Sequence, residues 1–201
     1  GAGSCFPTAG KKNMWAEINP GDKLEFVVND PDNAVSKVKF HVNKKGKGMW
    51  MEIKKGECGC GNFSQMPTKT YKCMQITRAK ILPDSDISTS TVEFKVANSW
   101  FVSNGVARNG VALFRYTGTW EELSTSLGID DGTFTSYTAE TPGFSLFAIG
   151  VKPSAVQVQQ EAVAPPEVVQ EVPSDLDALE EQATETTGRS TKRTLCFLQI
   201  K

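Results

Sequence analysis

A dense run of short β-like segments in residues 91–150 constrains the fold of this chain more than any other feature. Apolar and polar residues alternate in TVEFKVANSW, which places Val92, Phe94 and Val96 on one face. Such alternation indicates a half-buried strand. Further strand-like runs follow at intervals of about ten residues, with glycine-containing turns between them, a spacing typical of a sandwich or barrel. The large aromatic residues Trp100 and Trp120 are expected in its core.

The preceding residues continue this pattern. Two more segments alternate between apolar and polar residues, and their predicted inward positions are Val38, Phe40, Val42, Met49, Met51 and Ile53. A Pro20-Gly21 pair and an Asp130-Asp131-Gly132 sequence predict turns, and Gly105 predicts the end of one helical turn. We therefore predict an all-β fold, an Ig-like antiparallel β-sandwich of short strands over residues 15–150, preceded by an N-terminal extension at 1–14.

The composition changes after residue 150. Residues 151–193 are rich in Pro, Gln and Glu and contain no aromatic residue, so they predict an extended spacer. A short helix over LDALEEQA is expected there, capped by Ser174 or Asp175. Residues 194–201, TLCFLQIK, return to a strand-like apolar pattern. A free apolar strand is a liability unless it pairs with a sheet, so we expect it to pair with one.

Overall charge and hydropathy exclude two classes of partner. The formal net charge is -1, which gives no overall field for nucleic acid or an anionic membrane. No stretch approaches the ~18 consecutive apolar residues of a membrane helix. We expect no nucleic-acid partner and no membrane span.

The sequence offers little for catalysis or for binding a cofactor. His41 is the only histidine, and it falls on the polar face of a predicted strand. The paired acids Asp84/Asp86 and Asp130/Asp131 lie in predicted turns, and no glycine-rich phosphate loop occurs between a strand and a helix. We expect no enzymatic activity, no cofactor and no metal site.

Five cysteines raise the question of cross-links; they are Cys5, Cys58, Cys60, Cys73 and Cys196. We predict a disulfide from Cys73 to Cys58 or Cys60, with a zinc site as the alternative, although a fourth ligand is missing for zinc. Cys5 and Cys196, near opposite ends, are placed best for bonds between molecules. Asn62 begins the sequon Asn-Phe-Ser and is a candidate glycosylation site.

Four stretches carry a resemblance to a known family; they are LEFVVNDPDNAVSKVKFHV, LPDSDISTSTVEFKVANSWFVSNG, VALFRYTGTWEEL and GIDDGTFTSYTAETPGFSLFAIG. With them, residues 15–149 resemble the PGF-pre-PGF domain of archaeal cell-surface and secreted proteins. The resemblance implies an archaeal extracellular or cell-surface location, a β-sandwich module and no catalytic residues. Two features depart from the family pattern: the cysteine-rich insertion around Cys58, and the place of Pro142-Gly143-Phe144 inside the domain.

Together these features predict a structural subunit of an archaeal extracellular filament, pilus-like fibre or sheath. Residues 194–201 would add as a strand to a neighbouring copy, with further disulfides between copies. The expected contact residues are Leu195, Phe197, Leu198 and Ile200. In one alternative, residues 194–201 complete their own sandwich. In another, the protein is a monomeric cell-surface binding or adhesion module for a glycan or protein, with Trp50 at the binding face.

Overall fold

The structure is a computed structural model that describes residues 9–56, 66 and 68–153. All of these residues belong to the first of two compact units, Gly1–Ala164, and the second unit is Pro165–Lys201. The expected spacer, its short helix and the strand at 194–201 lie outside the described residues.

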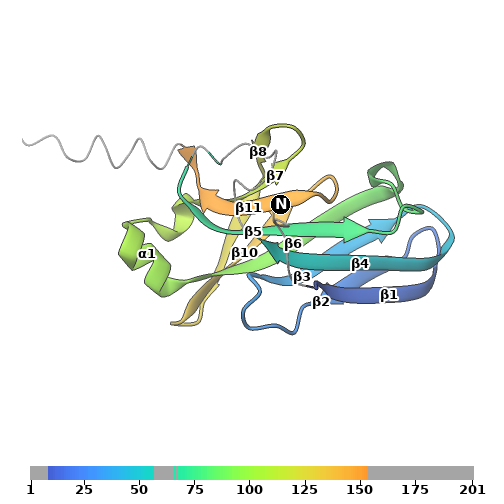
Figure 1. Ribbon diagram of the computed structural model, residues 1–201, viewed down its shortest axis with the longest axis horizontal. Coiled ribbons are helices and arrows are strands. Elements are labelled where there is room, and N and C mark those ends of the chain that lie inside the picture. The colour runs from blue at the N-terminus through green and yellow to red at the C-terminus, as the bar shows by residue number, and fades with distance from the viewer. Residues whose placement is uncertain (1–8, 57–65, 67, 154–201) are drawn as a thin grey trace, which may run out of the picture. The chain divides into compact units, whose positions relative to one another are not determined.

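Two antiparallel sheets make up the described part of the chain (Figure 1). The six-stranded sheet has the order β1 (Lys11–Ile18), β4 (Gly46–Gly56), β5 (Thr70–Arg78), β11 (Leu146–Val151), β7 (Val111–Tyr116) and β8 (Trp120–Glu122). The five-stranded sheet has the order β2 (Lys23–Val27), β3 (Val35–Val42), β6 (Ile87–Ala97), β10 (Phe134–Glu140) and β9 (Thr125–Asp130). The predicted all-β antiparallel sandwich is confirmed.

The main core lies between the two sheets and contains the residues that the alternation of apolar and polar positions predicted to face inward. The nine inward residues predicted from the sequence are all buried; they are Val38, Phe40, Val42, Met49, Met51, Ile53, Val92, Phe94 and Val96. Aromatic rings pack between the two layers. The Phe40 ring contacts Trp15 and Phe144 edge-on, with ring centroids 5.6 Å and 5.7 Å apart, respectively. Burial of this apolar area is the main favourable contribution to folding.

Trp100 and Trp120 lie elsewhere than predicted. Both are half-buried rather than inside the core. Trp100 packs on Tyr71 at the edge of the main core. Trp120 packs on a second, smaller apolar cluster, which is formed by Cys73, Ala112, Phe114 and Ala148. These four residues alternate with core-facing residues on β5, β7 and β11, so the cluster lies on the outer face of the six-stranded sheet.

Short helical segments connect some strands. The helix α1 (Asn98–Asn104) ends at Gly105, whose φ of 63° allows its N–H to reach the Phe101 and Val102 carbonyls. This confirms the predicted glycine cap. Two 3₁₀ turns, η1 (Asp84–Asp86) and η2 (Arg108–Gly110), precede β6 and β7. Among the described residues, no helix has the length and hydropathy needed to cross a bilayer.

A charge cluster around Asp84 holds together segments that are distant in sequence. The Asp84 carboxylate accepts hydrogen bonds from the guanidinium groups of Arg78, at 2.5 Å, and Arg115, at 2.7 Å. It also accepts the Phe144 backbone N–H at 3.3 Å. A Cβ on Gly143 would overlap this carboxylate. The Pro142-Gly143-Phe144 link between β10 and β11 therefore needs glycine because Asp84 packs against it.

Candidate functional site

The edges of the two sheets form two sides of the sandwich. On one side the chain passes from β1 to β2 through a turn in which the Asp22 N–H donates to the Asn19 carbonyl at 3.0 Å. On the other side it passes from β8 to β9 at the buried Leu123, whose N–H donates to the Leu113 carbonyl at 2.9 Å. Each sheet thus ends in one edge strand on each side. Edge strands expose backbone groups, so these are the places where another strand can add.

Within the described part of the chain, no strand pairs with the outer edge of β1. In β4, the Trp50 carbonyl accepts the Ala79 N–H of the β5 side at 2.9 Å. Backbone groups in a central strand alternate between its two neighbours, so Met49, Met51 and Ile53 bond to β1. Their partners in the register are Trp15, Asn13 and Lys11.

Lys12, Met14 and Ala16 alternate with those partners along the strand, so by this rule their backbone N–H and C=O groups point away from the sheet. The β1–β4 register runs from Lys11 to Ile18 without a recorded shift. The open edge of β1 is therefore long and regular.

The backbone of β2 is open on the same side. The Val28 N–H donates to the Ser36 carbonyl at 2.8 Å, and the Val42 N–H donates to the Asp22 carbonyl at 3.0 Å. Even-numbered residues of this strand therefore bond to β3. The odd-numbered residues, which are Lys23, Glu25 and Val27, face away from it.

A groove of about 530 Å³ lies between these two open edges. Its lining comes from the start of β1 and the end of β2: Lys11, Lys12, Asn13, Glu25, Phe26, Val27, Val28 and Asn29. Phe26 and Val28 are buried, so the groove has an apolar floor and a largely polar rim. It lies between two strand edges with which no described strand pairs.

One end of the groove runs into a smaller pocket that shares Lys11 and contains Asp30 and Lys55. The Lys55 Nζ lies 3.6 Å from Asp30 Oδ2. A hydrogen bond from the Asp32 backbone N–H, and secondarily the charge of Lys55, lower the pKa of Asp30. Asp30 therefore stays ionised at neutral pH and limits the apolar part of the groove at this end.

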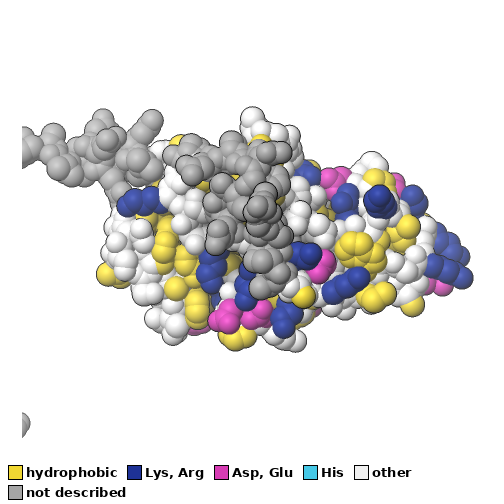
Figure 2. Space-filling model, viewed as in Figure 1, with side chains coloured by type: hydrophobic (Ala, Val, Ile, Leu, Met, Phe, Trp, Pro, Cys, Tyr) yellow, Lys and Arg dark blue, Asp and Glu magenta, His cyan; other side chains and the backbone are white. Residues whose placement is uncertain are grey.

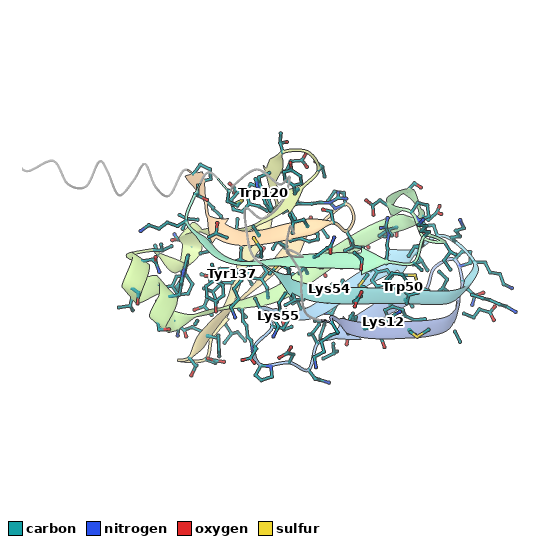
Figure 3. All side chains as sticks on the ribbon, in the orientation of Figure 1. Lys12, Trp50, Lys54, Lys55, Trp120 and Tyr137 are labelled. Carbon is teal, nitrogen blue, oxygen red and sulfur yellow. The ribbon has the colours of Figure 1, made fainter. Side chains whose placement is uncertain are left out.

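The outer surface beside β1 carries exposed apolar side chains. Met14 is 65% exposed and lies directly opposite the half-buried Trp50 in the register. The Lys12 Nζ lies 4.6 Å from the Trp50 ring centroid, in the range of a cation–π contact. Figure 3 shows these two side chains on neighbouring strands, and Figure 2 shows a hydrophobic patch bordered by basic side chains in this region.

The other side of the sandwich offers one short edge strand and one bulged edge strand. β8 has only three residues. The register of β9 with β10 shifts between Thr135 and Tyr137, which marks a β-bulge. At this bulge the Ser136 hydroxyl accepts the Ile129 N–H at 2.8 Å and donates to the Ile129 carbonyl at 3.0 Å. Ile129 is 77% exposed, but both of its backbone groups are already bonded.

Most candidate residues from the sequence lie outside the described residues; they are Cys5, Cys58, Cys60, Cys196, Asn62, Leu195, Phe197, Leu198 and Ile200. Cys73 is described: it is buried on the outer face of β5 and is disulfide-bonded. Its pairing with Cys58 or Cys60 stays a prediction. Within the described ranges, no group of three metal-ligating side chains lies together.

The open edge of β1 was missed at the sequence level. β1 begins at Lys11, inside the segment expected to be an N-terminal extension. An edge strand with half-exposed side chains on both faces gives no clean alternation, and KKNMWAEI has none. The only available signal was the apolar run from Met14 to Ala16.

Comparisons with known proteins add no family. A scan against protein-family models finds no match to this chain, and a search of curated proteins finds none either. The resemblance to the PGF-pre-PGF domain stays a prediction.

Proposed function

We propose that this chain is a structural subunit of an archaeal extracellular filament, pilus-like fibre or sheath, assembled by β-strand addition between copies. The observation that carries the proposal is the open side of the sandwich, where β1 and β2 both leave regular backbone edges beside an apolar-floored groove. An added strand gains backbone hydrogen bonds from the edge, and its alternate side chains fill the groove.

Residues 194–201 are the strand that we propose to be donated. They are strand-like and apolar, and they follow a spacer of about 40 residues. Extended at about 3.3 Å per residue, that spacer spans on the order of 100 Å. This length lets the strand of one copy reach the open side of another. Head-to-tail addition of this kind need not close into a ring, so it produces a fibre.

Cysteines would reinforce such an assembly outside the cell, where disulfides persist. Gly56, the last residue of β4, pairs with Cys73 in the register. The chain therefore leaves β4 directly opposite Cys73, two residues before Cys58, which supports a bond from Cys73 to Cys58 or Cys60. Cys5, Cys196 and the other of Cys58 and Cys60 then remain, and Cys5 and Cys196 would form the bonds between copies.

Deletion of residues 194–201 tests the proposal. We expect the full chain to form concentration-dependent polymers in light scattering and electron microscopy, and the truncated chain to remain monomeric. Deletion of eight spacer residues, 154–161, is the matched control and should leave the polymers intact. Polymers of the truncated chain would contradict the proposal. A full chain that is monomeric at every concentration would also contradict it, and would favour pairing within one copy.

One observation favours a second function, a monomeric module that binds a cell-surface glycan or protein. Trp50 lies on the outer face of β4 beside Met14, which is mostly exposed. Partly exposed aromatic side chains beside other apolar groups are frequent anchors of such contacts. In that case the protein truncated after residue 193 would still bind cell-wall material, and Trp50→Ala would lose this binding.

A further inference from the structure

We infer that β1, and not β2, receives the donated strand, and that residues 194–201 of a second copy pair along Met14-Trp15-Ala16. This inference rests on the proposed function and specifies its contact surface. Both edges offer three residues with open backbone groups, so the side chains and the length of each edge decide between them.

Residues 194–201, if paired as a strand, would carry apolar side chains on both faces. Leu195, Phe197 and Gln199 would share one face, and Cys196, Leu198 and Ile200 the other. In a sheet, each face of an added strand packs beside the matching face of its neighbour. The acceptor must therefore offer an apolar side chain on each face.

β1 meets this requirement. Met14 points to the outer face and is 65% exposed. Trp15 points inward, is only half-buried, and meets Phe40 in the core. An added strand would cover Met14 on one face and extend the core beside Trp15 on the other. The groove floored by Phe26 and Val28 continues from there along the start of β1.

β2 meets it less well. Its outward side chains at the open positions are Lys23, Glu25 and Val27, all exposed, and only Val27, at 47% exposed, is apolar. Glu25 lies 3.7 Å from the Lys37 ammonium group, so much of this face is an ion-paired polar surface. Charged side chains on an edge strand oppose the addition of an apolar strand. β2 is also five residues long, whereas β1 and the donated segment each have eight.

Proline at an open position separates the two edges experimentally. The Ala16 N–H points away from β4, so Ala16→Pro removes no hydrogen bond of the folded subunit but blocks the edge. Lys23→Pro does the same at the first residue of β2. We expect Ala16→Pro to raise the concentration needed for polymers about tenfold or more, and Lys23→Pro to leave it unchanged. The reverse result would overturn the inference.

Two further experiments distinguish failure of the proposed function from failure of the choice of β1. If deletion of residues 194–201 leaves the polymers intact, the proposed function fails. If that deletion removes them while a folded Ala16→Pro retains them, only the choice of β1 fails. Circular dichroism and thermal unfolding establish whether Ala16→Pro folds. If it does not fold, Met14→Lys takes its place, because Met14 is exposed and its replacement disturbs no buried contact. Polymers of Met14→Lys at wild-type concentration would then overturn the inference.

Discussion

The two sides of the sandwich look alike in their side chains and differ in their backbones. Each side has an edge strand with an exposed apolar residue, Met14 at 65% on β1 and Ile129 at 77% on β9. On β1 the register is continuous, whereas on β9 it shifts at a bulge where the Ser136 hydroxyl bonds both backbone groups of Ile129. The proposed interface therefore rests on the regularity of the backbone edge and not on exposed apolar area alone.

A matched pair of substitutions tests this comparison most strongly. Met14→Lys places a charge beside the proposed added strand, so we expect the concentration needed for polymers to rise about tenfold or more. Ile129→Lys makes the same change on the bulged edge and should have no effect. Sedimentation of both variants over a concentration series measures the difference. Equal effects would show that the two sides do not differ in assembly.

A substitution at Asp84, away from both edges of the sandwich, should lower the stability of the fold without preventing assembly. Asp84→Ala leaves the guanidinium groups of Arg78 and Arg115, which are 18% and 11% exposed, without their carboxylate. We expect the free energy of unfolding to fall by about 3 kcal/mol in urea titrations, while polymers still form from the folded fraction.

The control for this change is Asp86→Ala, on the same 3₁₀ turn. Asp86 pairs with Lys44 at 3.4 Å on the surface, so its loss should cost less than about 1 kcal/mol. A loss of stability as large as that of Asp84→Ala would contradict the role assigned to the cluster.

A substitution at the bulge on β9 should have a smaller effect on stability. Ser136→Ala removes both hydrogen bonds to Ile129, and we expect a loss of about 1 kcal/mol of stability. Amide hydrogen exchange should show faster exchange at the Ile129 N–H. Thr138→Ala, an exposed position on the same face of β10, is the control and should leave that exchange rate unchanged. Unchanged exchange in Ser136→Ala would contradict the hydrogen bond from the Ile129 N–H to the Ser136 hydroxyl.

Substitution of the turn aspartates Asp30 and Asp131 should give the smallest change in stability. The backbone N–H groups of Phe134 and Thr133 lower the pKa of Asp131, and the N–H of Asp32 lowers that of Asp30. Each group is thus more acidic in the folded than in the unfolded chain. Its stabilising contribution is present above the unfolded pKa of about 3.9 and is lost as the pH falls through the folded value.

Asp131→Asn and Asp30→Asn should therefore lower the urea midpoint slightly at pH 7 and not at about pH 2. The two variants should behave alike, because the same kind of hydrogen bond acts on both sides. A destabilisation that persists at the lower pH would show that the carboxylate charge is not its cause.

The sequence predicted the layers of the fold better than its edges. Alternation located inward residues such as Phe40 and Phe94 because a half-buried central strand repeats with period two. The glycine cap at Gly105 followed from local chemistry alone. The same rule fails for β9, where Leu127 and Ile129 alternate but a bulge leaves both exposed.

Long-range contacts were out of reach for a different reason. Asp84 meets Arg115 and Phe144 across 31 and 60 residues, and no local pattern connects those positions. The open edge of β1 depends on which strands pair, and pairing is a property of the tertiary structure. Of the two partners in the proposed contact, only the segment TLCFLQIK could be picked out beforehand, because its pattern is local.

The most direct test of the central claim mixes two chains that cannot assemble alone. The chain without residues 194–201 keeps an open β1 but lacks the strand, whereas the full chain with Ala16→Pro keeps the strand but has a blocked edge. Light scattering of the mixture should show a one-to-one complex of two chains that grows no further. Two monomers that stay separate at concentrations where the unmodified chain polymerises would contradict strand addition at β1.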